Sequence, residues 1–217
     1  MVPSGPAELE GGAPTSIDRL LDRYAVLAPP VSSAGSAVTL VLREGQREVE
    51  TLLIVRTTTP EDPAAGQVAL PGGHVSDGDG SLASTALREL EEEVGLGLAD
   101  LAGPPRFVRL APAPRFQLTV GVFAAALGPV AQRPAPRSPT EVAHVFWLPR
   151  SALAVTRQVV RETPIGPLEV HATVAEGEVV WGFTRRVLRD FFGFPPENDL
   201  AGPEDLSHSG STELPPT

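Results

Sequence analysis

Residues 70–96 read LPGGHVSDGDGSLASTALRELEEEVGL, and the rest of the chain can be arranged around this stretch. Its first part combines a proline, four glycines and two aspartates directly after an apolar segment, so the backbone must turn tightly there. A helix is predicted to follow, because Ser81 or Asp79 can cap its first turn and Gly95 can end it. Apolar residues recur at helical spacing between these ends, at Leu82, Ala83, Ala86, Leu87, Leu90 and Val94.

Three glutamates share one solvent-reachable face of the predicted helix. At about 100° per residue, Glu89, Glu92 and Glu93 fall within an arc of roughly 100°, whereas Glu91 points elsewhere. Carboxylates at this spacing repel one another, so the helix loses stability unless a cation compensates. Mg²⁺ takes oxygen ligands and commonly bridges a few carboxylates to substrate phosphates, and Arg88 can pair with Glu92 four residues later. The face is therefore either a metal-binding surface or an ordinary solvated acidic surface.

The same residues resemble the signature of the Nudix hydrolases, G-x5-E-x7-R-E-U-x-E-E-x-G-U, in which U is aliphatic. The second half matches without exception, at Arg88, Glu89, Leu90, Glu92, Glu93, Gly95 and Leu96. In the first half the sixth residue after Gly73 is Asp79 rather than glutamate, and eight residues instead of seven separate it from Arg88. This shifted form is similar to that of the coenzyme A pyrophosphatase branch. The resemblance implies an α/β fold, the Nudix-type α/β/α sandwich with a mixed β-sheet.

The resemblance also implies a metal-dependent hydrolase that uses Mg²⁺ or Mn²⁺. A metal-bound water would attack phosphorus, and Glu89 or Glu141 would accept its proton. The residues with an expected catalytic role are Glu89, Glu92, Glu93 and Arg88. The expected metal ligands are Glu89, Glu93, Glu92 and a backbone oxygen of Gly73, and the expected substrate contacts are Arg56, Gly72, Gly73 and Glu141.

A second segment resembles the coenzyme A branch but departs from it in one respect. Leu52, Leu53 and Arg56 match its LLxxR strand, and Gly66 opens a segment that matches G-x-x-x-F-P-G-G except for Leu70 in place of phenylalanine. The branch has an arginine between the strand and this glycine, where the chain has Glu61 and Asp62. A guanidinium there would suit the 3′-phosphate of coenzyme A, whereas carboxylates repel phosphate.

These features predict hydrolysis of a pyrophosphate bond in a nucleotide-derived small molecule. Coenzyme A or an acyl-CoA would give 3′,5′-ADP and phosphopantetheine. Two alternatives stay open: a Nudix hydrolase of ADP-ribose, a dinucleotide or a nucleoside triphosphate, and a catalytically inactive nucleotide-binding regulator. Regulators derived from this family typically lose the glutamates of the signature, and this chain keeps them.

Composition limits the remaining possibilities. The 217 residues contain no cysteine, which excludes disulfides and thiolate metal sites. No apolar run approaches the length of a membrane span and the first residues do not form a signal peptide, so we expect a cytoplasmic protein with no membrane partner. The net charge is −10, and no basic stripe suggests duplex nucleic acid. We expect a monomer or homodimer.

The chain is predicted to form one domain, residues 15–195, between a flexible N-terminal tail, 1–14, and a disordered acidic tail, 196–217. The predicted helices outside the signature cover residues 16–27 and 181–192. The predicted strands cover residues 37–42, 49–55, 67–70, 107–110, 116–127, 140–148, 155–160 and 168–173. The Pro-rich loop 128–139 carries Arg133 and Arg137, which either bind an anionic part of the substrate or serve only solubility.

Overall fold

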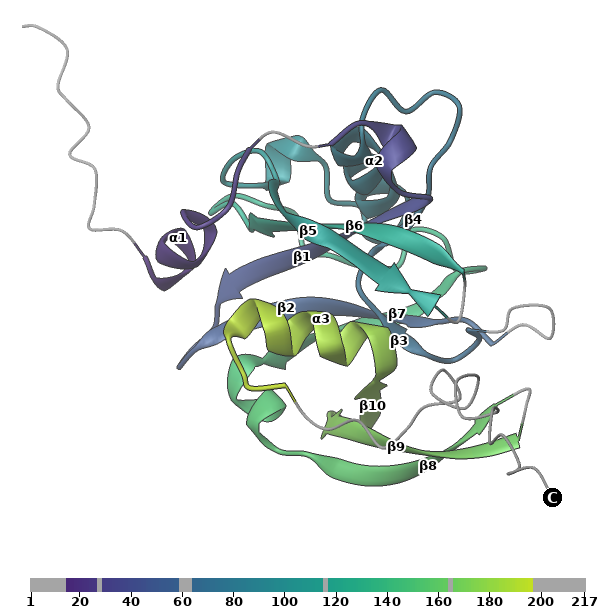
Figure 1. Cartoon of the computed structure of the whole chain (residues 1–217). Helices are drawn as coiled ribbons and strands as arrows, with labels where there is room; N and C mark the ends of the chain where they lie inside the picture. The colour runs from purple at the N-terminus through teal and green to yellow at the C-terminus, as the bar shows by residue number, and fades with distance from the viewer. Residues whose placement is uncertain (1–14, 27–28, 59–63, 115–116, 164–165, 197–217) are drawn as a thin grey trace, which may run out of the picture.

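A computed structural model describes residues 15–26, 29–58, 64–114, 117–163 and 166–196. Apart from Pro196, both predicted tails lie outside these residues. A central sheet with helices on both sides makes up most of the described chain (Figure 1). No helix in the described ranges combines the length and the apolar character needed to cross a membrane.

The central sheet has seven strands and mixed direction. The strand order is β3-β2-β1-β6-β5, with β4 paired to β1 and β7 paired to β2. The pairing of β1 with β6 is parallel and the other pairings are antiparallel. The strands are β1 (Ser36–Glu44), β2 (Val49–Arg56), β3 (Val68–Ala69), β4 (Gly72–His74), β5 (Arg106–Ala113), β6 (Leu118–Ala126) and β7 (Val142–Pro149). The predicted hairpin of residues 37–55 is therefore confirmed, and β3 is shorter than predicted.

Strands β1 and β2 pair over only part of their length, which opens the sheet where the signature begins. They are in register from Leu42 opposite Thr51 to Glu44 opposite Val49. Toward its start, β1 pairs instead with β4, while β2 continues alongside β7 and β3. Gly72 and Gly73, the first two residues of β4, directly follow a bend at Pro71 and are called the Gly72–Gly73 bend below. This bend lies where β1 and β2 diverge.

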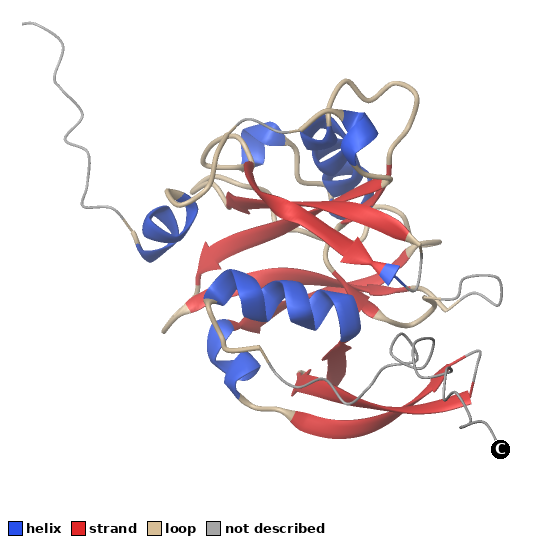
Figure 2. Ribbon diagram, viewed as in Figure 1, coloured by secondary structure: helices blue, strands red, loops and turns tan. Residues whose placement is uncertain are grey.

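Both faces of the sheet are covered, which explains the apolar runs in β1 and β2. Val41 of β1 packs in the cluster beneath α2 (Leu82–Val94), whereas its neighbours Leu40 and Leu42 pack in the cluster beneath α3 (Gly182–Phe192). Figure 2 shows α2 above the strands β1 and β6 and α3 below them. The predicted sandwich of helix, sheet and helix is confirmed.

A separate three-stranded antiparallel sheet precedes α3. It comprises β8 (Arg157–Thr163), β9 (Gly166–Ala175) and β10 (Glu178–Trp181), in the order β10-β9-β8. The first two strands were predicted and β10 was missed, because only Glu176 and Gly177 separate it from β9. These two residues adopt positive φ angles of 52° and 84°, as a two-residue hairpin turn requires.

The N-terminal helix is shorter than predicted. Helix α1 covers Ser16–Leu21, and Thr15 caps it by accepting a hydrogen bond from the Asp18 N–H. Three single-turn helices complete the described elements: η1 (Val31–Ser33), η2 (Leu98–Asp100) and η4 (Arg150–Ala154).

Leu90 anchors α2 to the sheet, and its truncation should destabilise the protein. The side chain is fully buried with Val41, Leu52 and Ile54. Leu90→Ala should therefore lower the free energy of unfolding by about 2 to 5 kcal/mol, as large-to-small changes in cores do. Urea denaturation followed by circular dichroism measures this loss. Leu98→Ala is the control, because Leu98 is 54% exposed; equal losses in the two variants would mean that α2 is oriented otherwise.

Candidate active site

Helix α2 starts and ends with local signals that fix its register. Ser81 is the N-cap: its Oγ accepts the Ser84 N–H at 3.1 Å, and the Ser84 Oγ accepts the Ser81 N–H at 2.8 Å. Of the two predicted caps, Ser81 is therefore the one used, and Asp79 is free for another contact. Gly95 ends the helix in the left-handed conformation with φ 76°.

The Gly72–Gly73 bend lies against two glutamates of α2. The Gly72 N–H donates to Glu93 Oε2 at 2.8 Å. A Cβ on Gly73 would be only 2.5 to 2.6 Å from the carboxylate atoms of Glu89, so this carboxylate rests directly on the bend. Gly72 has φ +148°, and a Cβ there would overlap the carbonyl oxygen of Ala37. The backbone thus requires glycine at position 72, whereas glycine at position 73 leaves room for the Glu89 carboxylate.

The expectation that all three glutamates lie on a solvent-reachable face is wrong for Glu93. This residue is 2% exposed, whereas the Glu92 side chain is 55% exposed. Burial raises the pKa of Glu93 to about 7, opposed by the hydrogen bond from Gly72 and reinforced by the charge of Glu89. Burial also raises the pKa of Glu89, although the hydrogen bond from Arg88 opposes this shift. The helical spacing placed Glu93 beside the apolar stripe, and the sheet covers it there.

Arg88 connects the turn to the glutamates. Its Nη1 donates to Glu92 Oε2 at 2.9 Å and to Glu89 Oε1 at 2.8 Å, and its Nη2 donates to Asp79 Oδ2 at 3.0 Å. The predicted pairing of Arg88 with Glu92 is therefore present. The hydrogen bonds from Arg88 are the main reason that the pKa of Asp79 falls to about 2. Arg88 thus fixes two of the three glutamates relative to the turn.

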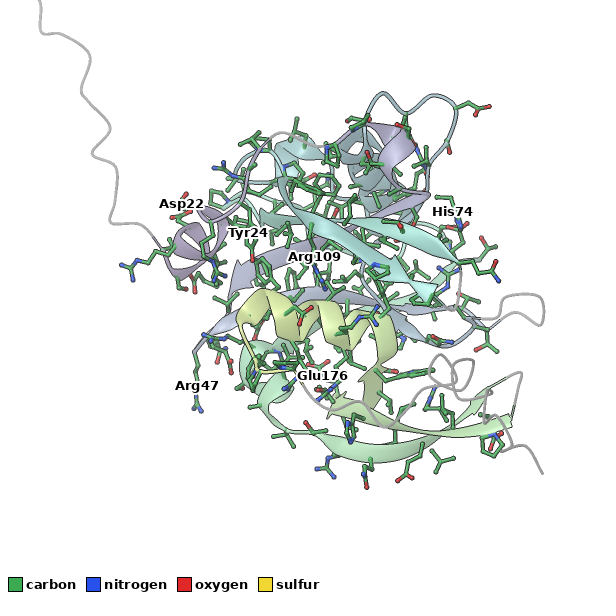
Figure 3. All side chains as sticks on the ribbon, in the orientation of Figure 1. Asp22, Tyr24, Arg47, His74, Arg109 and Glu176 are labelled. Atoms are coloured by element: carbon green, nitrogen blue, oxygen red, sulfur yellow. The ribbon has the colours of Figure 1, made fainter. Side chains whose placement is uncertain are left out.

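The polypeptide between the bend and α2 is held in the same network. Asp79 Oδ2 also accepts the Ser76 N–H at 2.9 Å and the Thr85 hydroxyl at 2.9 Å. Arg88 Nη2 donates to the carbonyl oxygen of His74 at 2.9 Å. His74, at the end of β4, is labelled in Figure 3, and its side chain is exposed. The roles of Ser76 and Thr85 were missed, because single hydroxyl residues leave no periodic signal in a sequence.

Two further predicted residues lie beside the glutamates. Arg56 is the last residue of β2, and its positive charge lowers the pKa of Glu93. Glu141 directly precedes β7, and its negative charge raises the pKa of both Glu89 and Glu93. Residues from β2, β4, α2 and the start of β7 therefore meet at one place.

The Pro-rich loop contacts the other end of α2. The Arg137 N–H donates to the Glu93 carbonyl at 2.9 Å, and the Ala135 N–H donates to the Val94 carbonyl at 3.2 Å. The Arg137 side chain lies over Gly95, in an open groove of about 640 Å³ that it shares with Glu91, Glu92 and Asp100. Arg133 is exposed. The loop thus completes the helix end, and three acids surround the arginine that could have met an anion.

The carboxylates suit a hard divalent cation by their chemistry. Glu89, Glu93 and Glu141 offer oxygen donors, and burial raises the pKa of both Glu89 and Glu93, with a further contribution from the neighbouring carboxylate charges. Within the described part of the chain, no three such side chains are close enough to enclose an ion. In this arrangement the Gly72 N–H donates a hydrogen bond to Glu93, and Arg88 donates hydrogen bonds to Glu89 and Glu92.

Known proteins resemble this chain in sequence and in fold. A family model described as the NUDIX domain matches residues 34–167. The chain is 32% identical over 197 residues to the uncharacterized Nudix hydrolase NudL of Cronobacter sakazakii, covering 82% of this chain and 94% of that protein. It is 30% identical over 193 residues to NudL of Salmonella heidelberg, covering 81% and 92%. A MutT/nudix family protein from Enterococcus faecalis has the same fold at 17% identity and a TM-score of 0.50, covering 77% of this chain and 62% of that one.

Proposed function

Because the chain belongs to the Nudix hydrolase family and is a pyrophosphohydrolase, we propose that it cleaves a nucleoside diphosphate linked to another group, with coenzyme A or an acyl-CoA as the preferred substrate. The products would be 3′,5′-ADP and phosphopantetheine or its acyl derivative. The observation that carries this proposal is the placement of Glu89 and Glu93 against the Gly72–Gly73 bend. Two carboxylates beside the backbone of two glycines are suited to a diphosphate and its cation.

Each residue of the site has a proposed task. Glu89 and Glu93, with Glu92 and a backbone oxygen of Gly73, would hold Mg²⁺ or Mn²⁺. When bound, this metal would neutralise phosphate charge and lower the pKa of a water molecule. Glu89 or Glu141 would take the proton of the attacking water. Arg88 fixes the Glu89 and Glu92 side chains through its hydrogen bonds.

Two features of the sequence bear on the substrate class, and they favour different substrates. The aspartate-bearing form of the signature resembles that of the coenzyme A branch and so supports coenzyme A. Its aspartate, Asp79, accepts hydrogen bonds from Arg88 Nε at 3.2 Å and Nη2 at 3.0 Å. The acidic residues Glu61 and Asp62, which lie outside the described residues, disfavour an additional phosphate. They favour the second candidate, a hydrolase of ADP-ribose or another diphosphate that lacks a 3′-phosphate.

A substrate panel with Mg²⁺, analysed by product chromatography, tests the proposal. We expect 3′,5′-ADP from coenzyme A, with kcat/KM at least about tenfold above that for ADP-ribose, a difference that one or two additional polar contacts supply. Dephospho-coenzyme A is the matched control, since it lacks only the 3′-phosphate. Equal or faster cleavage of this control together with AMP release from ADP-ribose would support the second candidate, and binding without turnover would support a regulator.

A further inference from the structure

Thr57, directly after β2, makes two hydrogen bonds to the segment that carries Glu141. Its N–H donates to the Glu141 carbonyl at 2.9 Å. Its Oγ1 donates to the Pro139 carbonyl at 3.0 Å. One residue therefore holds both the backbone of Glu141 and the loop that precedes it, and the second of these contacts depends on a side chain that substitution can remove.

An irregularity in the pairing of β2 with β7 lies next to this contact. Val55 pairs with His144, but the next residue, Arg56, pairs with Val142, so Ala143 forms a β-bulge. Bulges bend a strand and change the direction of its side chains, often next to active sites. If the side chains of β7 alternated regularly, Val142 would lie on the same face of the sheet as Phe146, which packs beneath α3. Val142 instead packs beneath α2, so the start of β7 is turned toward the glutamates.

The backbone around Glu141 is also fixed from the loop side. The Ser138 carbonyl accepts the N–H groups of Glu141 and Val142 at 2.9 and 2.8 Å. One residue earlier, the Arg137 N–H is bonded to the Glu93 carbonyl at 2.9 Å. Glu141 therefore lies on a short turn with one end attached to α2 and the other attached to Thr57.

We propose that Thr57 is a positioning residue that keeps Glu141 at the carboxylate face of α2, an inference that rests on the proposed pyrophosphate hydrolysis. Thr57 has no direct part in the chemistry. It sets the distance between Glu141 and the pair Glu89 and Glu93, so that a third negative charge is present where a divalent cation and a diphosphate would meet.

Thr57→Val tests this role, because valine keeps the shape of threonine and removes the hydroxyl. We expect kcat on the preferred diphosphate to fall about fivefold to tenfold with KM within twofold, and Thr57→Ser to restore kcat to within twofold of wild type. In a Glu141→Gln background the added Thr57→Val change should alter kcat by less than twofold. Thr51→Val in the preceding strand β2 is the matched control, because the buried Thr51 hydroxyl has no hydrogen-bond partner among the described residues.

Three outcomes would overturn the inference: unchanged kcat in Thr57→Val, an equal loss of kcat in the Glu141→Gln background, or failure of Thr57→Ser to restore turnover. Wild-type protein that hydrolyses no diphosphate would refute the proposed function instead. In that case titration with Mn²⁺ alone decides the role of Thr57. An at least threefold weaker dissociation constant in Thr57→Val supports it, because a displaced carboxylate attracts the cation less, and an unchanged constant refutes it.

Discussion

Glu93→Gln should lower kcat/KM by about 10²- to 10³-fold while the protein stays folded. Glutamine has nearly the same volume and still offers an oxygen to the Gly72 N–H, so the packing and the 2.8 Å hydrogen bond can persist. The substitution removes one negative charge from the proposed metal-binding face, and loss of one charge-stabilising group in an enclosed site typically has an effect of this size. Steady-state kinetics with saturating Mg²⁺ measures the loss.

In metal-free protein the same substitution should increase the free energy of unfolding at pH 8. The pKa of Glu93 is raised to about 7 in the folded protein, above its ordinary value of 4.5. A carboxyl group with a raised pKa favours folding when it is protonated, so its contribution is lost as the pH rises from about 4.5 through 7. Glutamine stays neutral at both pH values. Metal-free Glu93→Gln should therefore keep the about 2 to 3 kcal/mol of unfolding free energy that the wild type loses by pH 8. Chemical denaturation at pH 5 and pH 8, with a chelator present, tests the sign.

Glu91→Gln is the control for both measurements. Glu91 lies on the same helix but is exposed, and neither the Gly72–Gly73 bend nor Arg88 contacts it. Its change should leave kcat/KM within about twofold of wild type, as surface substitutions do. Full activity in Glu93→Gln, or an equal loss in Glu91→Gln, would mean that the buried glutamate is not a metal ligand.

The parts of the fold that could be predicted are those whose signals are local. Strands β1 and β2 contain apolar runs because both of their faces are covered, and α2 is preceded by a serine cap and followed by a terminal glycine. Strand β10 escaped prediction, because it is four residues long and its turn has no signal beyond Glu176 and Gly177. Short strands of this kind are specified by the neighbouring strand rather than by their own pattern.

The site shows the same division between local and long-range information. Spacing alone brought Glu89, Glu92 and Glu93 to one side of α2. The burial of Glu93 could not be predicted, because it depends on β4, whose position is set by its pairing with β1. The position of Glu141 depends on the bulge at Ala143, and a bulge is an irregularity of pairing between two strands that are far apart in sequence.

Gly73→Ala should lower kcat by about 10- to 100-fold with little loss of stability. The new Cβ would lie 2.5 to 2.6 Å from the Glu89 carboxylate, which must move. This carboxylate is the end of a flexible side chain, so the fold can accommodate the methyl group by displacing it. A displacement of about 1 Å in a reacting or metal-binding group is enough for a loss of this size. Steady-state kinetics and thermal denaturation of the same sample separate the two effects.

Gly72→Ala is the matched comparison, because the same methyl group at the adjacent residue should act through folding instead. Its Cβ would meet the Ala37 carbonyl oxygen and the Val38 Cα, which are backbone atoms of the central strand β1, at a φ of +148° that alanine rarely adopts. Neither neighbour can rotate away, so we expect a loss of about 3 kcal/mol or more in the free energy of unfolding. Full activity in Gly73→Ala would mean that hydrolysis does not depend on the position of the Glu89 carboxylate against Gly73. If both variants lost only stability, the bend would serve the fold rather than the chemistry.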